Sequence, residues 1–133
     1  DLVALVSDHV CKEIGLDEDS LHWVSVAVRE SVANAIKHGN KNDHTKKVFV
    51  EFDGTFGAIP ELAISVRDQG AGFDPEEVAD PLAPENLLKG SGRGIFLIRN
   101  FMDEVVLRRA PQGGMEIRMV KRVQPAGASD LKA

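Results

Sequence analysis

The chain has 133 residues, 43% hydrophobic and 28% charged, a composition typical of one globular domain with one core. Its net charge of −5 and pI near 5.3 argue against a binder of duplex nucleic acid, which needs a basic face. No apolar run approaches the roughly 18 residues of a membrane span. The single cysteine, Cys11, excludes an internal disulfide and a cysteine cluster, so we expect a small buried hydrophobe and a reducing, cytoplasmic compartment.

Residues 2–14 predict the first helix, which Gly15 ends. Its apolar residues recur at helical spacing, namely Leu2, Leu5, Val6 and Val10. Exposed apolar surface is what a protein partner uses, so this helix is a candidate docking surface through Leu2, Leu5 and Val6.

The second helix is predicted over the stretch LHWVSVAVRESVANAIKHG, residues 21–39. Asp17 or Ser20 is the expected N-cap, because a short polar side chain there satisfies a free backbone N–H. Gly39 and Asn40 are expected to end the helix.

The remaining elements are mostly strands, in which apolar and polar residues alternate. They are expected at residues 46–53, 61–67, 104–109 and 114–122, with a further helix at about 93–102. Asp53, Gly54 and Gly57 should form the turn after the first strand, and PQGG the turn of the last hairpin. Residues 80–92, with two prolines, are expected to form an ordered but mobile lid.

This order of elements predicts an α+β fold. Short turns make the strands mostly antiparallel in a mixed sheet, and the helices should cover one face, giving a two-layer α/β sandwich. We expect one domain over residues 1–122, and a disordered tail over residues 123–133.

Polar residues on one face of the second helix are the first candidate site. Glu30, Asn34 and Lys37 or His38 recur at i, i+4 and i+7 or i+8, on the same side as Trp23. A buried polar group needs a partner, so a structural Asn is the alternative interpretation. As a site, the Asn and Glu oxygens suit Mg²⁺, and Glu30 could act as a general base.

The segment VRDQGAGFDP is the second candidate. Asp68 ends a strand, where its carboxylate can accept a hydrogen bond from an exocyclic amine such as that of adenine. Gly70 and Gly72 would let a ligand approach the backbone. A plain Asp-Gly turn is the alternative.

The third candidate is KGSGRG, residues 89–94, directly before the third helix. Free N–H groups at a helix N-terminus favour phosphate, and glycines let successive N–H groups surround an anion. A flexible hinge is the alternative. The spacing fits neither a Walker A loop nor a dinucleotide-binding fingerprint.

Together the three segments resemble the GHKL, or Bergerat-type, ATP-binding superfamily, in which an ExxxNAxxH helix, a DxGxG loop and a GxGxG lid occur in this order. ESVANAIKHGN and GSGRGIFLIRNFMDEV are most similar to the anti-sigma factor serine/threonine kinases of the RsbW and SpoIIAB type. The resemblance implies the histidine-kinase-like ATPase fold over about residues 1–122. It also implies a kinase that binds a sigma factor and uses ATP and Mg²⁺ to phosphorylate a small STAS-type anti-sigma antagonist.

The resemblance assigns a role to each residue of the three segments. Glu30 corresponds to the general base, Asn34 to the Mg²⁺ ligand, and Asp68 to the adenine-binding carboxylate. Further nucleotide contacts are implied for Lys37, His38, Gly70, Gly72, Lys89, Gly90, Ser91, Gly92, Arg93 and Gly94. Members of this family commonly dimerise, and a sheet edge or the first helix could serve here; direct contact with nucleic acid or a membrane is not expected.

One position departs from the pattern. SpoIIAB-type sequences can carry an arginine where this chain has Gly90, and Lys89 and Arg93 are the flanking cations. An arginine that stabilises the transferring phosphate can be worth about 10³-fold in rate. Two alternatives therefore stay open: a nucleotide-binding partner-switching module without catalysis, and an excised histidine-kinase catalytic domain.

Overall fold

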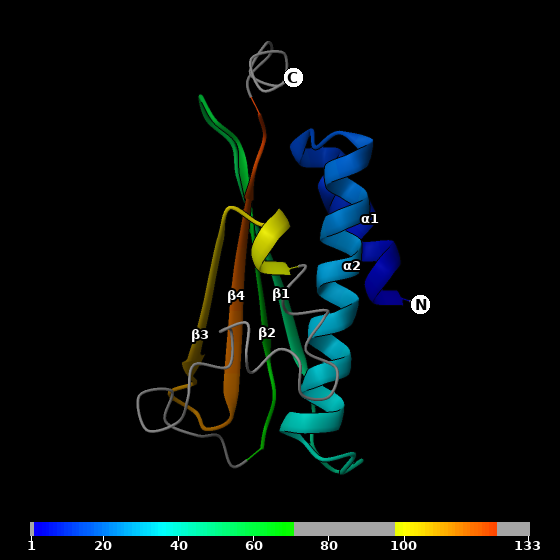
Figure 1. Cartoon of the computed structure of the whole chain (residues 1–133), viewed down its shortest axis with the longest axis vertical. Helices are drawn as coiled ribbons and strands as arrows, with labels where there is room; N and C mark the ends of the chain where they lie inside the picture. The colour runs from blue at the N-terminus through cyan, green and yellow to red at the C-terminus, as the bar shows by residue number, and fades with distance from the viewer. Residues whose placement is uncertain (1, 71–97, 125–133) are drawn as a thin grey trace.

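The computed structural model describes residues 2–70 and 98–124. Two helices, α1 (Leu2–Ile14) and α2 (Glu18–Asn34), lie on one side of an antiparallel sheet, as Figure 1 shows. The sheet has the order β1-β2-β4-β3, with bounds Phe49–Thr55, Glu61–Arg67, Met115–Arg122 and Glu104–Arg109 respectively. The predicted two-layer α+β sandwich is confirmed, and every described strand pair is antiparallel.

The start of α2 follows from local chemistry. Asp17 has extended backbone geometry and accepts a hydrogen bond from Ser20 N at 2.7 Å, so Asp17 rather than Ser20 is the N-cap. This backbone N–H lowers the pKa of the Asp17 carboxyl. Gly15, with φ of +97°, ends α1 in a left-handed conformation that glycine adopts without strain.

Helical structure ends at Gly39, with Asn40 as its C-cap, as predicted, but the last turn is not α-helical. Residues Ala35–Gly39 form a π-helical turn, in which Asn40 N donates to Ala35 O at 2.8 Å. The left-handed residues after it are Lys41 and Asn42, not Gly39 or Asn40.

The first strand begins and ends later than residues 46–53. Lys46 N donates to Asp43 O within a turn, so the ladder starts only at Phe49. At the far end, Gly54 pairs with Leu62 inside the ladder, where a Cβ would overlap the side chain of Ile14. The predicted turn at Asp53 and Gly54 was therefore wrong, because the missing side chain makes room for α1.

The core lies between the helices and the sheet. Its buried members come from α1, α2, the helical segment 98–101, the residues directly after these helices, and two strands, β2 and β4: Cys11, Ile14, Leu16, Val24, Ala27, Val28, Ala35, Leu62, Ile64, Val66, Ile98, Met102 and Met119. Cys11 is fully buried, as expected, and burial raises the pKa of its thiol to about 11. Within the described residues, no helix combines the length and apolarity needed to cross a membrane.

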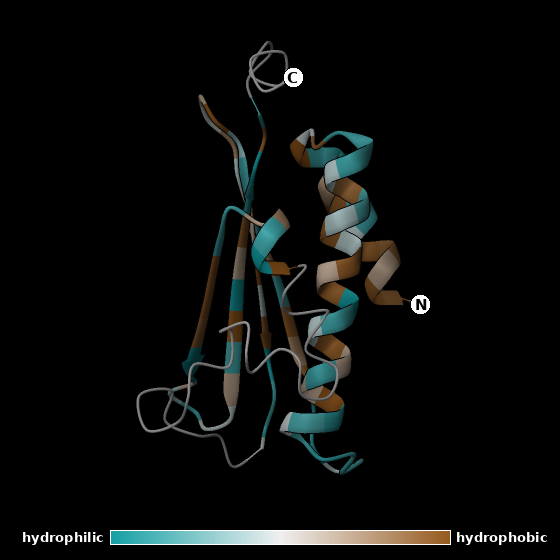
Figure 2. Cartoon of the chain, viewed as in Figure 1, coloured by the Kyte–Doolittle hydropathy of each residue, from teal (hydrophilic) through white to brown (hydrophobic). Residues whose placement is uncertain are grey.

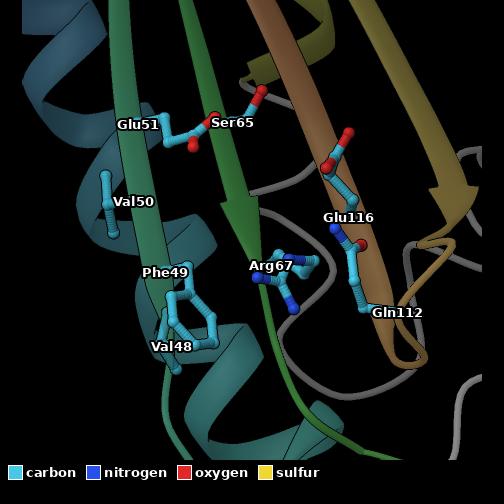
Figure 3. Close-up of a pocket in the computed structure, with 8 residues that line it drawn as sticks. All are labelled: Val48, Phe49, Val50, Glu51, Ser65, Arg67, Gln112 and Glu116. Carbon is cyan, nitrogen blue, oxygen red and sulfur yellow. The ribbon is translucent and has the colours of Figure 1, made fainter.

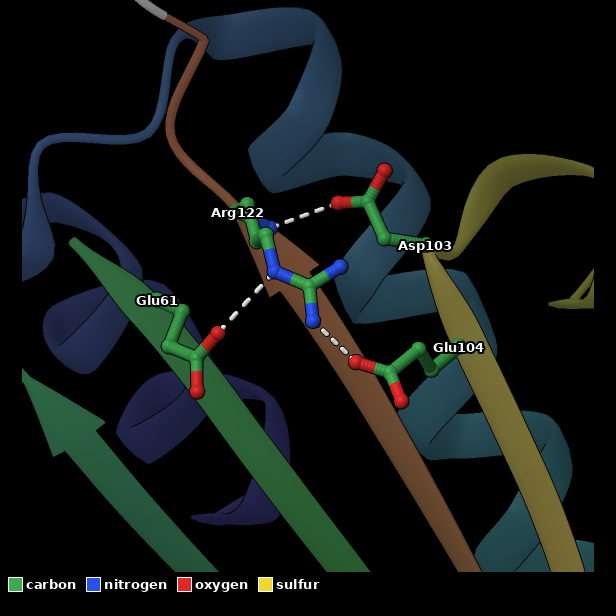
Figure 4. A network of polar contacts seen from close by, with 4 residues as sticks. All are labelled: Glu61, Asp103, Glu104 and Arg122. Carbon is green, nitrogen blue, oxygen red and sulfur yellow. Dashed lines mark hydrogen bonds and ion pairs between the residues drawn. The ribbon is translucent and has the colours of Figure 1, made fainter. Parts of the chain in front are cut away.

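Ion pairs and hydrogen bonds stabilise the end of the sheet where β2 begins and β4 ends. The Arg122 side chain lies between Glu61 and Glu104 and donates a hydrogen bond to each. Its backbone N donates to Asp103 Oδ2 at 2.6 Å (Figure 4). One residue further, Val123 N still donates to Pro60 O at 2.8 Å, so ordered pairing passes the boundary predicted at residue 122. The rest of the predicted tail, residues 125–133, lies outside the described residues.

We predict that Ile64→Ala lowers the free energy of unfolding by about 2–5 kcal/mol, because Ile64 is fully buried and a cavity would remain. The matched control is Ile59→Ala, at a site 53% exposed, where a change within about 0.5 kcal/mol is expected. Urea unfolding measures both, and equal losses in the two variants would contradict this description of the core.

Candidate functional site

Glu30 and Asn34, the two polar residues predicted to act together, are both half-buried on α2. The helix turns Val24, Val28 and Ser31 to the core, where Ser31 Oγ contacts Met119 Sδ at 3.5 Å. Glu30 and Asn34 lie one turn apart on a flank of the core face. Glu30 forms no hydrogen bond or ion pair with any described residue.

The same flank of α2 carries Trp23. Its ring stacks on Phe101, with centroids 4.0 Å apart and planes 3° from parallel. Lys121 Nζ donates to Phe101 O at 2.9 Å, which ties the helical segment 98–101 to β4 as well. The stack therefore brings the chain that follows the predicted lid against the flank of α2 that bears Glu30 and Asn34.

Lys37 and His38 are less well placed than the sequence suggested. Both lie in the π-helical turn and are exposed. A π turn has more residues than an α turn, so the 100° spacing that put these side chains on the face of Asn34 does not continue past residue 34. Their contact with nucleotide stays a prediction.

Asp68 occupies a buried position directly after β2, with 5% of its surface exposed. Its Oδ1 accepts from Gly70 N at 2.9 Å and from Met115 N at 3.2 Å, and its own N donates to Met115 O at 3.0 Å. The carboxylate is thus fixed by the backbone of its own loop and of β4, as a residue that recognises a ligand group must be. A plain Asp-Gly turn would not need the contact with β4.

Glycines enclose Asp68 on three sides. A Cβ at Gly39 would overlap Asp68 Oδ2, and a Cβ at Gly114 would overlap Asp68 O. A Cβ at Gly70 would overlap Gly39 O. The end of α2, the loop after β2 and the β3–β4 hairpin therefore meet backbone to backbone, at the lower end of the molecule in Figure 1.

Sequence reasoning missed one structural residue of this site, Asn40. It is 3% exposed, its Nδ2 donates to Lys47 O at 3.1 Å, and its Oδ1 accepts from Gln69 N at 2.8 Å. Gln69 Oε1 in turn accepts from Lys47 N at 2.7 Å. Asn40 thus ties the helical turn after α2 to the Asp68 loop, whereas its place after a helix predicts only a cap.

The remaining predicted contacts lie outside the described residues: Gly72, Lys89, Gly90, Ser91, Gly92, Arg93 and Gly94. What the structure does bring together fits a nucleotide. Asp68 offers a fixed acceptor for an exocyclic amine, and the absence of a Cβ at Gly39 and Gly70 lets the backbone pack closely around it. Asn34 offers a carboxamide oxygen for a metal held with phosphates. Within residues 2–70 and 98–124, no three His, Cys, Asp or Glu side chains gather as a metal site.

The sequence also matches known proteins over most of its length. Residues 2–121 match the family described as Histidine kinase-like ATPase domain. The anti-sigma F factor of Oceanobacillus iheyensis is 37% identical over 109 residues, which cover 79% of this chain and 71% of the relative. The anti-sigma F factor of Bacillus subtilis is 33% identical over 83% of this chain and 75% of the relative. The serine-protein kinase RsbW of Staphylococcus epidermidis is 32% identical over 92% of this chain and 79% of the relative.

A solved structure agrees on the fold. The histidine kinase domain of the blue-light activated histidine kinase EL346 from Erythrobacter litoralis superposes with a TM-score of 0.54 at 18% identity. The match covers 84% of this chain and 48% of that chain. The family resemblance seen in the three motifs is confirmed, and the chain belongs to the histidine kinase-like ATPase family.

Proposed function

We propose that this chain is an ATP- and Mg²⁺-dependent serine/threonine protein kinase that also binds a sigma factor. Its substrate is proposed to be a small STAS-type anti-sigma antagonist. The observation that carries the proposal is the buried carboxylate of Asp68, which backbone N–H groups of Gly70 and Met115 hold in place and against which Gly39 packs without a Cβ. The names of the relatives, anti-sigma F factor and serine-protein kinase RsbW, support the choice of reaction and partners.

The chemistry divides among three side chains. Asp68 accepts a hydrogen bond from the exocyclic amine of adenine and so selects the base. Asn34 is the residue that would hold Mg²⁺ beside the phosphates. Glu30 accepts the proton of the incoming serine or threonine hydroxyl as that oxygen attacks phosphorus. Bound ATP supplies the phosphoryl group and leaves as ADP, so the protein's part is positioning and charge neutralisation.

Partners would use other surfaces. Leu2 and Leu5 on α1 are 75% and 67% exposed, and the N-terminal turns of α1 are apolar, as the brown ribbon in Figure 2 shows. We assign this surface to a protein partner, because exposed apolar side chains that gather on one surface mark interaction sites. A homodimer is proposed as well. The net charge of −5 fits a regulator that acts through proteins and not by contacting DNA.

Replacing Gly39 tests base recognition. Gly39→Ala would push Asp68 Oδ2 from its position, so we expect ATP affinity to fall at least about tenfold, the loss of one hydrogen bond to a charged group. In the matched control Gly57→Ala, nothing lies within contact of the new Cβ, and affinity should be unchanged. Calorimetry measures both. If Gly39→Ala is too unstable to titrate, Asp68→Asn replaces it, and an unchanged affinity there rejects the assignment.

Replacing Asn34 tests the metal. Even outer-shell changes at metal sites cost about 10–100-fold in affinity, so Asn34→Ala should weaken binding of ATP with Mg²⁺ at least about tenfold. Binding of ATP without Mg²⁺ should change little. Gln124→Ala, which removes an exposed carboxamide after β4, is the control. Equal losses with and without Mg²⁺ would show that Asn34 does not hold the metal.

Glu30→Gln separates binding from transfer. The variant should keep ATP affinity and lose about 10²–10⁴-fold in the rate of phosphate transfer to a purified antagonist protein. Glu18→Gln, on the exposed first turn of the same helix, should transfer at the normal rate. Transfer that survives in Glu30→Gln means that Glu30 is not the base. ATP binding without transfer in the unmodified chain would instead favour the non-catalytic partner-switching module.

A further inference from the structure

The hairpin that joins β1 to β2 ends in an apolar loop. Thr55 pairs with Glu61, so the loop consists of residues 56–60, with the sequence FGAIP. Turns are rich in Gly, Pro, Asn, Asp and Ser, because these residues suit the backbone geometry of a turn. The loop has a Gly and a Pro, but turn geometry does not require Phe56 or Ile59. We call residues 56–60 the hairpin tip.

The large side chains of the hairpin tip do not belong to the core. Phe56 is 70% exposed and Ile59 is 53% exposed. A Cβ on Gly57 would meet no atom within 4 Å, so the tip stands clear of the described residues on that side. Figure 1 shows this hairpin in green, extending away from α2 at the top of the view. Packing within the described chain therefore does not account for Phe56 and Ile59.

Another exposed ring of the sheet is shielded by its own chain. Phe49 borders a hollow of about 350 Å³ on the face of the sheet away from the helices, as Figure 3 shows. The guanidinium carbon of Arg67 lies 4.2 Å from the centre of the Phe49 ring and covers it with a charged group. No described cation or ring lies over Phe56 in this way. The tip thus presents a bare apolar surface, which is what a binding partner covers.

Carboxylates surround the base of the hairpin tip. Glu61 follows the tip directly, and Asp53 lies on β1 just before it. Asp103 and Glu104 lie alongside, because both contact Arg122, which pairs with Glu61 in the register of β2 and β4 (Figure 4). The acids therefore come from three strands and the residue before β3, and they meet at one end of the sheet.

The start of α2 adds a further carboxylate to this end. The Ser20 N–H, and more weakly the charge of Lys121, lower the pKa of the Asp17 carboxyl, so Asp17 is ionised at neutral pH. Lys121 lies next to Arg122 on β4. Within the described chain, five carboxylates thus gather at this end of the sheet beside two cations. The surface next to the apolar tip is negatively charged.

This combination selects among possible partners. A loop that inserts into a membrane is normally flanked by Lys and Arg, because the lipid surface is anionic, and here carboxylates would oppose the approach. An amphipathic helix rich in Lys or Arg has the complementary pattern, an apolar stripe with cations along its edges. Such a helix is about 10–12 Å wide, so it can place its stripe on the tip while its cations reach the acids.

We propose that the hairpin tip binds an amphipathic basic helix of a partner protein. The apolar stripe of that helix packs on Phe56 and Ile59, and its Lys or Arg side chains pair with the surrounding carboxylates. β2 begins at the tip and ends just before Asp68, so this surface and the nucleotide site lie at opposite ends of the sheet. The inference does not depend on the proposed kinase activity, and it adds a docking surface separate from α1.

A synthetic helix tests the surface. The probe is a fluorescent peptide of two LKKLLKL repeats, and its control is the same peptide with every Lys replaced by Glu. Fluorescence anisotropy should show the Lys peptide binding at least about tenfold more tightly than the Glu peptide, because only the former complements the acids. The double variant Phe56→Ser with Ile59→Ser should bind the Lys peptide at least about tenfold more weakly than the unmodified chain.

The double variant keeps the net charge, so attraction by charge alone would persist in it and would leave the affinity unchanged. Both positions are exposed, so its midpoint of urea unfolding should stay the same. Val106→Ser, which removes a side chain 47% exposed on β3, is the matched control and should bind normally. Normal binding by the double variant, or equal binding of the Lys and Glu peptides, overturns the proposal.

Two further measurements name the other possible occupants. Binding of the unmodified chain to vesicles of phosphatidylcholine and phosphatidylserine, lost in the double variant, would assign the tip to a membrane. A chain that ends at Gln124 should bind the Lys peptide as the full chain does; affinity at least about tenfold higher would assign the tip to residues 125–133. ATP titration of the double variant should match the unmodified chain, so a failed docking surface and a failed nucleotide site are distinguished.

Discussion

The close approach of backbone to backbone around Asp68 is the constraint on which the site depends. Gly39 at the end of α2 and Gly70 after β2 touch without an intervening Cβ, and Gly114 closes the third side. Asn40 and Gln69 add hydrogen bonds across the same junction. Since a helix layer and a sheet layer normally keep side chains between them, this junction is where the two layers come closest.

Placing the site at this junction also explains the polar residues of α2. A helix packed on a sheet buries one face, here Val24 and Val28, and leaves its flanks half exposed. Glu30 and Asn34 use such a flank, between the buried face and solvent. Both side chains stay partly exposed, while the π turn and Asn40 hold the end of the helix against the Asp68 loop.

Local patterns in the sequence predicted the elements well where each element's own residues decide it. The bounds of β2 follow from the alternation of Leu62, Ile64 and Val66, and the last hairpin from Gly113 and Gly114, both at positive φ. The candidate site residues Glu30, Asn34 and Asp68 come from local motifs too, and their roles stay predictions. Features that depend on contacts between segments distant in the chain could not be predicted from the sequence. Lys47 N donates to Gln69, and β1 begins only after it. Gly54 lies where a side chain would overlap Ile14. Asn40 accepts a hydrogen bond from Gln69 N, 29 residues further along the chain.

The partner of Asp68 has a consequence for the order of events during synthesis. Met115, 47 residues further along, supplies both the donor to Asp68 Oδ1 and the acceptor for its N–H. In the sheet β2 lies between β1 and β4, and only β1 precedes it in the chain. On a ribosome the β1–β2 hairpin can therefore form early, but its long-range pairing must wait until β4 has emerged. The carboxylate of Asp68 is among the last parts to reach its final position, so an incomplete chain would carry the motif without the fixed geometry.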